Sequence, residues 1–135
     1  MTVFLLIKRV LPQNEIDFAH WYRKRGKNVG VTIRTKHFKD YDMGYGTFAR
    51  FRDDIAEFVP SEPSQGTIKF LEQYDCDGKL SYKDCKELLS DINDMPDNGK
   101  YYGYLGRGIN ESLTIPIFKM MLSNAYRYRC NLYWF

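Results

Sequence analysis

The chain has 135 residues, of which 44% are hydrophobic and 16% aromatic, and it carries a formal net charge of +3. This length and composition suit one folded domain, 1–135, with a core of its own, and they argue against a disordered chain. No apolar run approaches the length of a membrane span, and the N-terminal run is shorter than the core of a signal peptide.

The first 40 residues predict a strand, a helix and a second strand. The apolar run 3–10 reads as a buried strand, and Asn14 is a suitable cap for a helix over about 15–25. Strict alternation of apolar and polar residues then predicts a half-buried strand over 28–38, with the inward parity continuing to His37. The pattern leaves open whether these strands form a parallel βαβ unit or pair antiparallel.

The middle of the chain predicts helices joined by turns. Residues 41–46, which contain two glycines, read as a turn-rich bridge before a helix over 47–58 that Thr47 caps. Apolar side chains at helical spacing make the buried stripe of this helix: Phe48, Phe51, Ile55 and Phe58. Two further amphipathic helices are expected around an acidic turn, the first marked by Ile68, Leu71 and Tyr74, the second by Cys85, Leu88, Leu89 and Ile92.

The last third predicts a strand at 101–105, a helix over 115–128 and a closing strand at 130–135. Pro116 suits the first turn of that helix because its missing N–H would have no partner there. Together these elements predict an α+β fold. We expect a compact single domain in which a small sheet packs with four or five helices.

The acidic turn is the most specific motif. With Gly78 as the sharp-turn glycine of a calcium loop, the ligands would be Asp75, Asp77, Ser81 and Asp84. This EF-hand-like pattern over 73–84 is degenerate, because Gln73 replaces the usual first aspartate and the last ligand is an aspartate rather than a glutamate. The same residues predict a purely structural turn, in which Ser81 and Asp84 form a capping box.

Two sets of surface residues are candidate partner-binding sites. Charge is segregated: 11 Lys and Arg stand against 4 Asp and Glu in 1–52, 4 against 12 in 53–99, and 5 against 1 in 100–135. Such segregation indicates either a bipolar surface or an acidic middle that folds back on basic ends. A basic patch on the predicted helix end and strand would attract a phosphate backbone or an acidic protein surface, or is simply a solvated face: Arg23, Lys24, Arg25, Lys27, Arg34 and Lys36.

The second set lies in a glycine-rich aromatic loop, where Tyr102, Tyr104 and Arg107 suit base stacking or a protein contact, although a plain strand and loop would look the same. A third, weaker candidate is the glycine-rich start of helix 47–58 with Arg50 and Arg52, an arrangement suited to an anion.

Catalysis and cofactors are not expected. No nucleophile accompanies a base and an orienting group, and the cysteines Cys76, Cys85 and Cys130 lack the spaced histidines of a zinc site. The odd number of cysteines, with no CxxC pair, argues against a secreted disulfide framework and predicts a reducing cytoplasm.

Four segments carry a resemblance to known sequences: YDMGYGTFARFRDDIAEF, FLEQYDCDGKLSYKDCKELLSDI, YYGYLGR and NLYWF. Their order over 41–135 resembles an uncharacterised group of small proteins encoded by bacteriophages and other mobile elements. The resemblance implies a phage-type accessory protein of the host bacterial cytoplasm that binds and inhibits a host or defence protein. The alternatives are a nucleic-acid-binding protein that uses the basic N-terminal patch and a divergent EF-hand-like calcium-binding module. We expect no membrane partner.

Overall fold

The computed structural model describes residues 30–75, 77–103 and 112–135. The predicted strand 3–10 and helix 15–25 lie outside these residues. So do Cys76 and six of the candidate partner-binding side chains: Arg23, Lys24, Arg25, Lys27, Tyr104 and Arg107.

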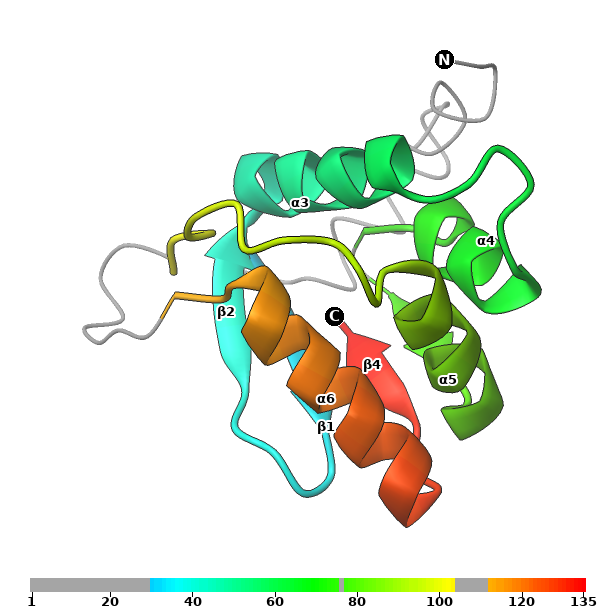
Figure 1. Ribbon diagram of the computed structural model, residues 1–135. Coiled ribbons are helices and arrows are strands. Elements are labelled where there is room, and N and C mark those ends of the chain that lie inside the picture. Colours follow the sequence, from blue (N-terminus) through cyan, green and yellow to red (C-terminus); the bar gives the residue numbers. More distant parts are fainter. Residues whose placement is uncertain (1–29, 76, 104–111) are drawn as a thin grey trace, which may run out of the picture.

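The predicted α+β class is confirmed. Within the described residues, four helices lie over one face of a sheet of four antiparallel strands, arranged in the order β2-β1-β4-β3 (Figure 1). The strands are β1 Gly30–Thr35, β2 Tyr41–Gly44, β3 Gly78–Leu80 and β4 Leu132–Trp134. The helices are α3 Tyr45–Phe58, α4 Gln65–Glu72, α5 Tyr82–Asp91 and α6 Ile115–Tyr128. Among the described residues, no helix is long and apolar enough to cross a membrane.

Strand β1 confirms the predicted alternation. Val31, Ile33 and Thr35 are each at most 1% exposed, whereas Arg34 points away from the helices into solvent. The inward parity does not continue to His37, which is exposed because the chain turns after Thr35. Both partners of β1, namely β2 and β4, run antiparallel to it.

Strand β2 corrects the sequence interpretation. Residues 41–44 were predicted as a turn, but they pair with β1 in the register Gly30↔Gly44 to Ile33↔Tyr41. Tyr41 and Met43 are buried while the residues between and after them are half-buried, so this strand does alternate. Two inward residues are too short a pattern to outweigh two glycines, and long-range pairing with β1 decides the structure.

Helix α3 begins at Tyr45, two residues before the predicted start. Its N-cap is Gly44, so Thr47 does not cap it. Phe48, Phe51 and Ile55 are fully buried as predicted, but Phe58 is 39% exposed. The helix therefore directs its apolar stripe into the core through its first three turns only.

The helices around the acidic turn hold the expected positions with one shift. In α4 the buried pair is Phe70 and Leu71, while Tyr74 lies beyond the helix and is 40% exposed. In α5, Cys85 and Leu88 are buried as predicted. The predicted strand 101–105 is reduced, within the described residues, to a single bridge between Tyr101 and Leu113.

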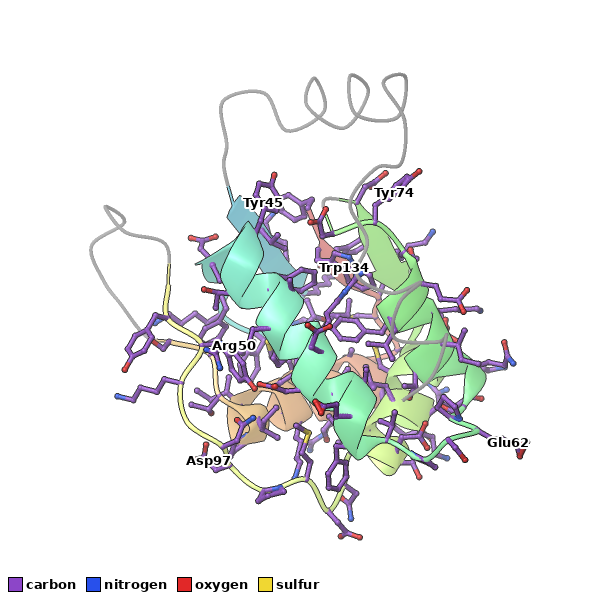
Figure 2. The ribbon with its side chains drawn as sticks, turned by 90° about the horizontal axis from the view of Figure 1, so that it is seen from above. Tyr45, Arg50, Glu62, Tyr74, Asp97 and Trp134 are labelled. Carbon is purple, nitrogen blue, oxygen red and sulfur yellow. The ribbon has the colours of Figure 1, made fainter. Side chains whose placement is uncertain are left out.

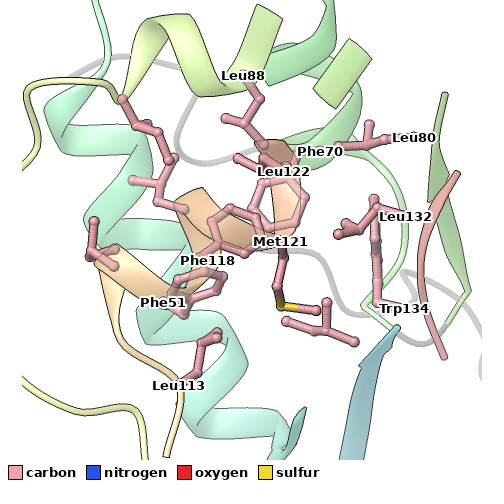
Figure 3. Packing of buried hydrophobic residues seen from close by; sticks show 14 of the residues in the cluster. Phe51, Phe70, Leu80, Leu88, Leu113, Phe118, Met121, Leu122, Leu132 and Trp134 are labelled. Atoms are coloured by element: carbon pink, nitrogen blue, oxygen red, sulfur yellow. The ribbon is translucent and has the colours of Figure 1, made fainter. Parts of the chain in front are cut away.

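The C-terminal elements match the prediction closely. Helix α6 spans Ile115–Tyr128, with a proline in its first turn, and β4 occupies the centre of the closing segment. Figure 3 shows how Phe51, Phe70 and Phe118 meet between α3, α4 and α6, with Trp134 of β4 beside them. These aromatic rings lie edge to face or tilted, with centroids 4.8–6.1 Å apart where Phe51 contacts Phe118 and Phe70.

Gly78 has a packing role rather than the role of a turn glycine. It is the first residue of β3, opposite Trp134 in the sheet register. A Cβ at this position would lie 1.9 Å from the indole ring of Trp134. The indole N–H in turn donates a hydrogen bond of 2.9 Å to the carbonyl oxygen of Tyr74 (Figure 2). The glycine thus leaves the space that the largest core side chain fills.

Candidate binding surface

An open hollow between α5 and the end of α6 is the most distinctive surface feature. It has a volume of about 520 Å³ and seven lining residues: Tyr82, Lys83, Lys86, Glu87, Ser90, Tyr126 and Arg129. Three of these are cations and two are tyrosines. The two helices pack along one another (Figure 1), so the residues that line the hollow are held in fixed relative positions. We call this hollow, with the lining residues just named, the α5–α6 surface.

Two parallel stripes on α5 explain why the hollow is cationic. Residues three and four apart share one side of a helix, so Lys83, Lys86 and Ser90 form one stripe, which lines the hollow. The acids of α5 form the neighbouring stripe at 84, 87 and 91, turned towards α4. The helix therefore directs its lysines to the hollow and its acids to α4.

The acidic stripe is occupied by α4. The carboxylate of Glu87 accepts the backbone N–H of Gly66 at 2.8 Å, and that of Asp91 accepts the backbone N–H of Ser64 at 2.8 Å. Carboxylates at a helix N-terminus satisfy otherwise unpaired donors and complement the helix dipole. Glu87 lines the hollow, yet its charge is engaged by α4, so it only partly balances the cations.

Each tyrosine ring of the hollow lies beneath a cation. The rings of Tyr82 and Tyr126 have centroids 6.3 Å apart. The guanidinium carbon of Arg129 lies 5.6 Å from the centroid of Tyr82, and the ammonium of Lys86 lies 5.0 Å from that of Tyr126. Cations at these distances are attracted to the ring face, so the rings hold the charged groups at the rim of the hollow.

The aromatic and basic character extends around the end of α6. Tyr126 and Tyr128 are 39% and 50% exposed, and the guanidinium carbon of Arg127 lies 5.7 Å from the ring centroid of Tyr128. The ring of His37 contacts Tyr128 with centroids 4.6 Å apart, which brings the turn after β1, including exposed Lys36, to the same end of the molecule.

The predicted basic patch is only partly described. Lys36 is exposed, as expected. Arg34 is also exposed, but its guanidinium makes a two-pronged contact with Asp40, with Nη2 at 2.7 Å and Nε at 3.1 Å. This hydrogen-bonded carboxylate raises the pKa of Arg34 and offsets its charge. Arg34 is therefore a weaker attractor of anions than the sequence indicated.

The aromatic loop is described at Tyr102, which is 67% exposed. The Arg50 side chain belongs to the support of this loop. Its guanidinium lies 4.4 Å from the ring centroid of Tyr101 and donates to the carbonyl oxygen of Lys100 at 3.2 Å, on the side of α3 that faces the loop (Figure 2). The predicted anion site at the start of α3 thus has its Arg50 directed to the protein's own backbone.

The acidic turn contains a complete set of internal contacts. Ser81 and Asp84 form a capping box on α5, with each side chain accepting the other's backbone N–H. The side chain of Gln73 bonds the backbone of Lys79 through both its oxygen and its nitrogen, at 3.0 and 2.8 Å. Asp75 is 6% exposed, whereas Asp77 is exposed. Within the described ranges, no three His, Cys, Asp or Glu side chains are grouped so that they could hold a metal ion.

Arg52 is a buried cation whose charge interacts with that of buried Asp75. The residue is 3% exposed, and its guanidinium donates to the carbonyl oxygen of Gln73 at 2.8 and 2.9 Å and to that of Leu71 at 3.4 Å. Burial lowers its pKa to about 10, and the negative charges of Asp75 and Asp53 oppose that shift. Arg52 stays charged at neutral pH and fixes the C-terminal end of α4 to α3. The sequence interpretation placed Arg52 at an anion site, and the structure places it in the interior.

The α5–α6 surface was not predicted from the sequence. The signal was present in residues 126–129, which read YRYR, and in the two lysines of α5. Interleaved aromatic and basic residues are typical of surfaces that recognise anions. The fold is needed to show that Tyr126 and Arg129 face α5.

Comparison with known proteins does not identify a relative: no protein-family model, curated protein or solved structure matches the chain. The resemblance to phage-encoded proteins therefore stays a prediction, and the site must be interpreted from its own chemistry.

Proposed function

We propose that the protein is a non-enzymatic binding protein whose α5–α6 surface engages an acidic surface of a partner protein. The resemblance to phage and mobile-element proteins supports the further proposal that this partner is a host or defence protein of the bacterial cytoplasm, which the chain inhibits by occupying it.

The observation that carries the proposal is the placement of two tyrosines, half-buried Tyr82 and exposed Tyr126, beneath cations around one hollow. Tyrosine and arginine are among the residue types that most often dominate the energy of protein interfaces, where they fill well-packed pockets from which water is excluded. Lys83 and Lys86 add positive potential, which accelerates encounter with an acidic partner. A nucleic acid is the competing anionic partner, and its binding would depend steeply on salt because each phosphate contact releases counterions.

A charge-reversal experiment tests the proposal. The tagged protein would be expressed in a bacterial host, and proteins that co-purify would be identified by mass spectrometry. Binding of the identified partner would then be compared between wild type and the double variant Lys83→Glu with Lys86→Glu. We expect slower association and at least tenfold weaker affinity, with the melting temperature unchanged within about 2 °C because both side chains are exposed.

The matched control is Lys79→Glu with Lys100→Glu. Both residues are exposed and neither lines the hollow, so the control makes the same change in net charge elsewhere. Equal losses in the two double variants would refute a specific surface. Co-purification of RNA or DNA, bound tightly at physiological salt and released by the Lys83 and Lys86 reversal, would favour the nucleic-acid alternative.

A further inference from the structure

The backbone of Arg129 is unusual. Among the described residues it is the single non-glycine residue with a positive φ, at φ 55° and ψ 45°. It ends α6 in the left-handed conformation, and the turn is closed by two hydrogen bonds. The N–H of Cys130 donates to the carbonyl oxygen of Ala125 at 2.9 Å, and the N–H of Arg129 donates to that of Tyr126 at 3.2 Å. This pair of bonds is the Schellman arrangement, which strongly favours glycine at the left-handed position.

An arginine at this position costs stability. A side chain with a Cβ is disfavoured in the left-handed region, where glycine carries no such penalty and asparagine carries less. Backbone strain of this kind that persists in a structure is a reason to look for a function of the side chain. Arg127, two residues earlier, carries the same charge in ordinary helical conformation but does not line the hollow.

The side chain of Arg129 completes the cationic rim of the hollow. Its guanidinium lies over Tyr82, opposite Lys86 over Tyr126, and Lys83 is the third cation. Among the described residues, Glu87 is the one carboxylate in the lining, and it accepts a hydrogen bond from α4. Three cations against one engaged carboxylate leave the hollow with a net attraction for an anion.

We propose that this hollow is an anchor pocket for an acidic side chain, carrying a carboxylate or a phosphate, on an extended segment of a partner protein. The proposal rests on the proposed function and names what that partner presents. Arg129 keeps its strained backbone because its planar guanidinium binds an oxyanion with two parallel hydrogen bonds, which neither glycine nor lysine provides.

The cations over the rings favour a protein side chain over a nucleic-acid base. Base recognition on a protein surface depends on open aromatic faces for stacking. Here Arg129 lies over Tyr82 and Lys86 lies over Tyr126. The hollow therefore presents charge, framed by rings, to an incoming anion.

Substitution of Arg129 gives an unusual combination of effects. Arg129→Gly and Arg129→Asn both suit the left-handed position, so they relieve strain while they remove the guanidinium. We expect Arg129→Gly to raise the melting temperature by about 2–5 °C, since relief of strain is spread over the unfolding entropy of a 135-residue chain. Arg127→Ala is the control, because it removes one charge from the same helix end and leaves the left-handed residue unchanged.

Binding would be measured by fluorescence anisotropy at physiological salt with three labelled probes. Two are peptides of one sequence rich in glutamate and tyrosine, which differ in a central glutamate or phosphoserine; the third is a 12-nucleotide oligothymidylate. We expect wild type to bind at least one peptide more tightly than the oligonucleotide, and the tighter peptide identifies carboxylate or phosphate as the anchor. Arg129→Gly and Arg129→Asn should weaken that peptide at least tenfold, and Arg127→Ala less than threefold.

Four results would overturn the proposal. They are no binding of either peptide at millimolar concentration, tighter binding of the oligonucleotide, unchanged peptide affinity in Arg129→Gly, and equal loss in Arg127→Ala. The outcome is separable from that of the proposed function. A partner that loses affinity in the Lys83 and Lys86 reversal but not in Arg129→Gly would leave the function standing and remove the anchor pocket.

Discussion

The buried guanidinium of Arg52 gives the sharpest test of the fold. Replacing it with methionine keeps the length and much of the volume of the side chain but removes the charge and every donor. The carbonyl oxygens of Gln73 and Leu71 would lose a partner, and Asp75, which is 6% exposed, would lose its neighbouring positive charge.

The expected loss is large because the remaining groups stay buried. An unsatisfied buried acceptor costs about 1–3 kcal/mol. Removing one partner of a buried ion pair costs about 3–5 kcal/mol, since the other charge stays uncompensated. These costs overlap, because the same guanidinium serves the carbonyls and Asp75. We therefore expect Arg52→Met to lower the free energy of unfolding by about 3–5 kcal/mol.

The assay is urea unfolding followed by helix circular dichroism at pH 7. Arg50→Met on the same helix is the control. Arg50 is exposed and its ion pair with Asp54 is 3.7 Å long, so a loss of about 1 kcal/mol or less is expected. Adding Asp75→Asn to Arg52→Met should recover about 1–2 kcal/mol, because it removes the uncompensated carboxylate. A loss below about 1 kcal/mol in Arg52→Met, or strict additivity of the two single changes Arg52→Met and Asp75→Asn, would refute this role of Arg52.

Four further predictions follow from the core and the turn. Phe51→Ala should lower the unfolding free energy by about 3–5 kcal/mol, since this ring is 0% exposed among four other aromatic rings; an unchanged urea midpoint would contradict it. In a Cys76→Ser background at pH 8, Cys130 should react quickly with a thiol reagent and Cys85 only on unfolding, because burial excludes reagent and raises the pKa of the Cys85 thiol to about 12. Burial and the hydrogen bond to Asp54 raise the pKa of Tyr101 to about 12. The stability that this tyrosine contributes is therefore complete below pH 10 and is lost as the pH rises from 10 to 12. Urea unfolding should show that the free energy of unfolding falls more steeply with alkaline pH in wild type than in Tyr101→Phe. Titration calorimetry at millimolar calcium should show no stoichiometric binding, and a one-site isotherm lost in Asp75→Ala would restore the EF-hand interpretation.

Periodic elements with clear ends were predictable from the sequence. The alternation of β1, the apolar stripe of α3 and the proline at the start of α6 each state a local preference that agrees with the final packing. The capping box of α5 was readable for the same reason, because its two hydrogen bonds join residues three apart. Local rules suffice where the partners are local.

Features set by distant partners could not be read this way. Strand β2 depends on its register with β1, and a glycine is required at position 78 by Trp134, which lies near the C-terminal end of the sequence. Arg52 looks like an exposed charge until the carbonyls at the end of α4 are placed against it. In each case the sequence shows the residue but does not show which distant residue packs against it.

Part of the acidic charge of the middle segment is used inside that segment. Glu87 and Asp91 serve the N-terminus of α4, a neighbour that is positive through its backbone dipole rather than through side chains. Because these acids bind the backbone of α4, they only partly balance the cations of the hollow. The positive character of the α5–α6 surface is thus a consequence of how α5 packs, and a helix with its acids and lysines interchanged would lose both the cap of α4 and the cationic hollow.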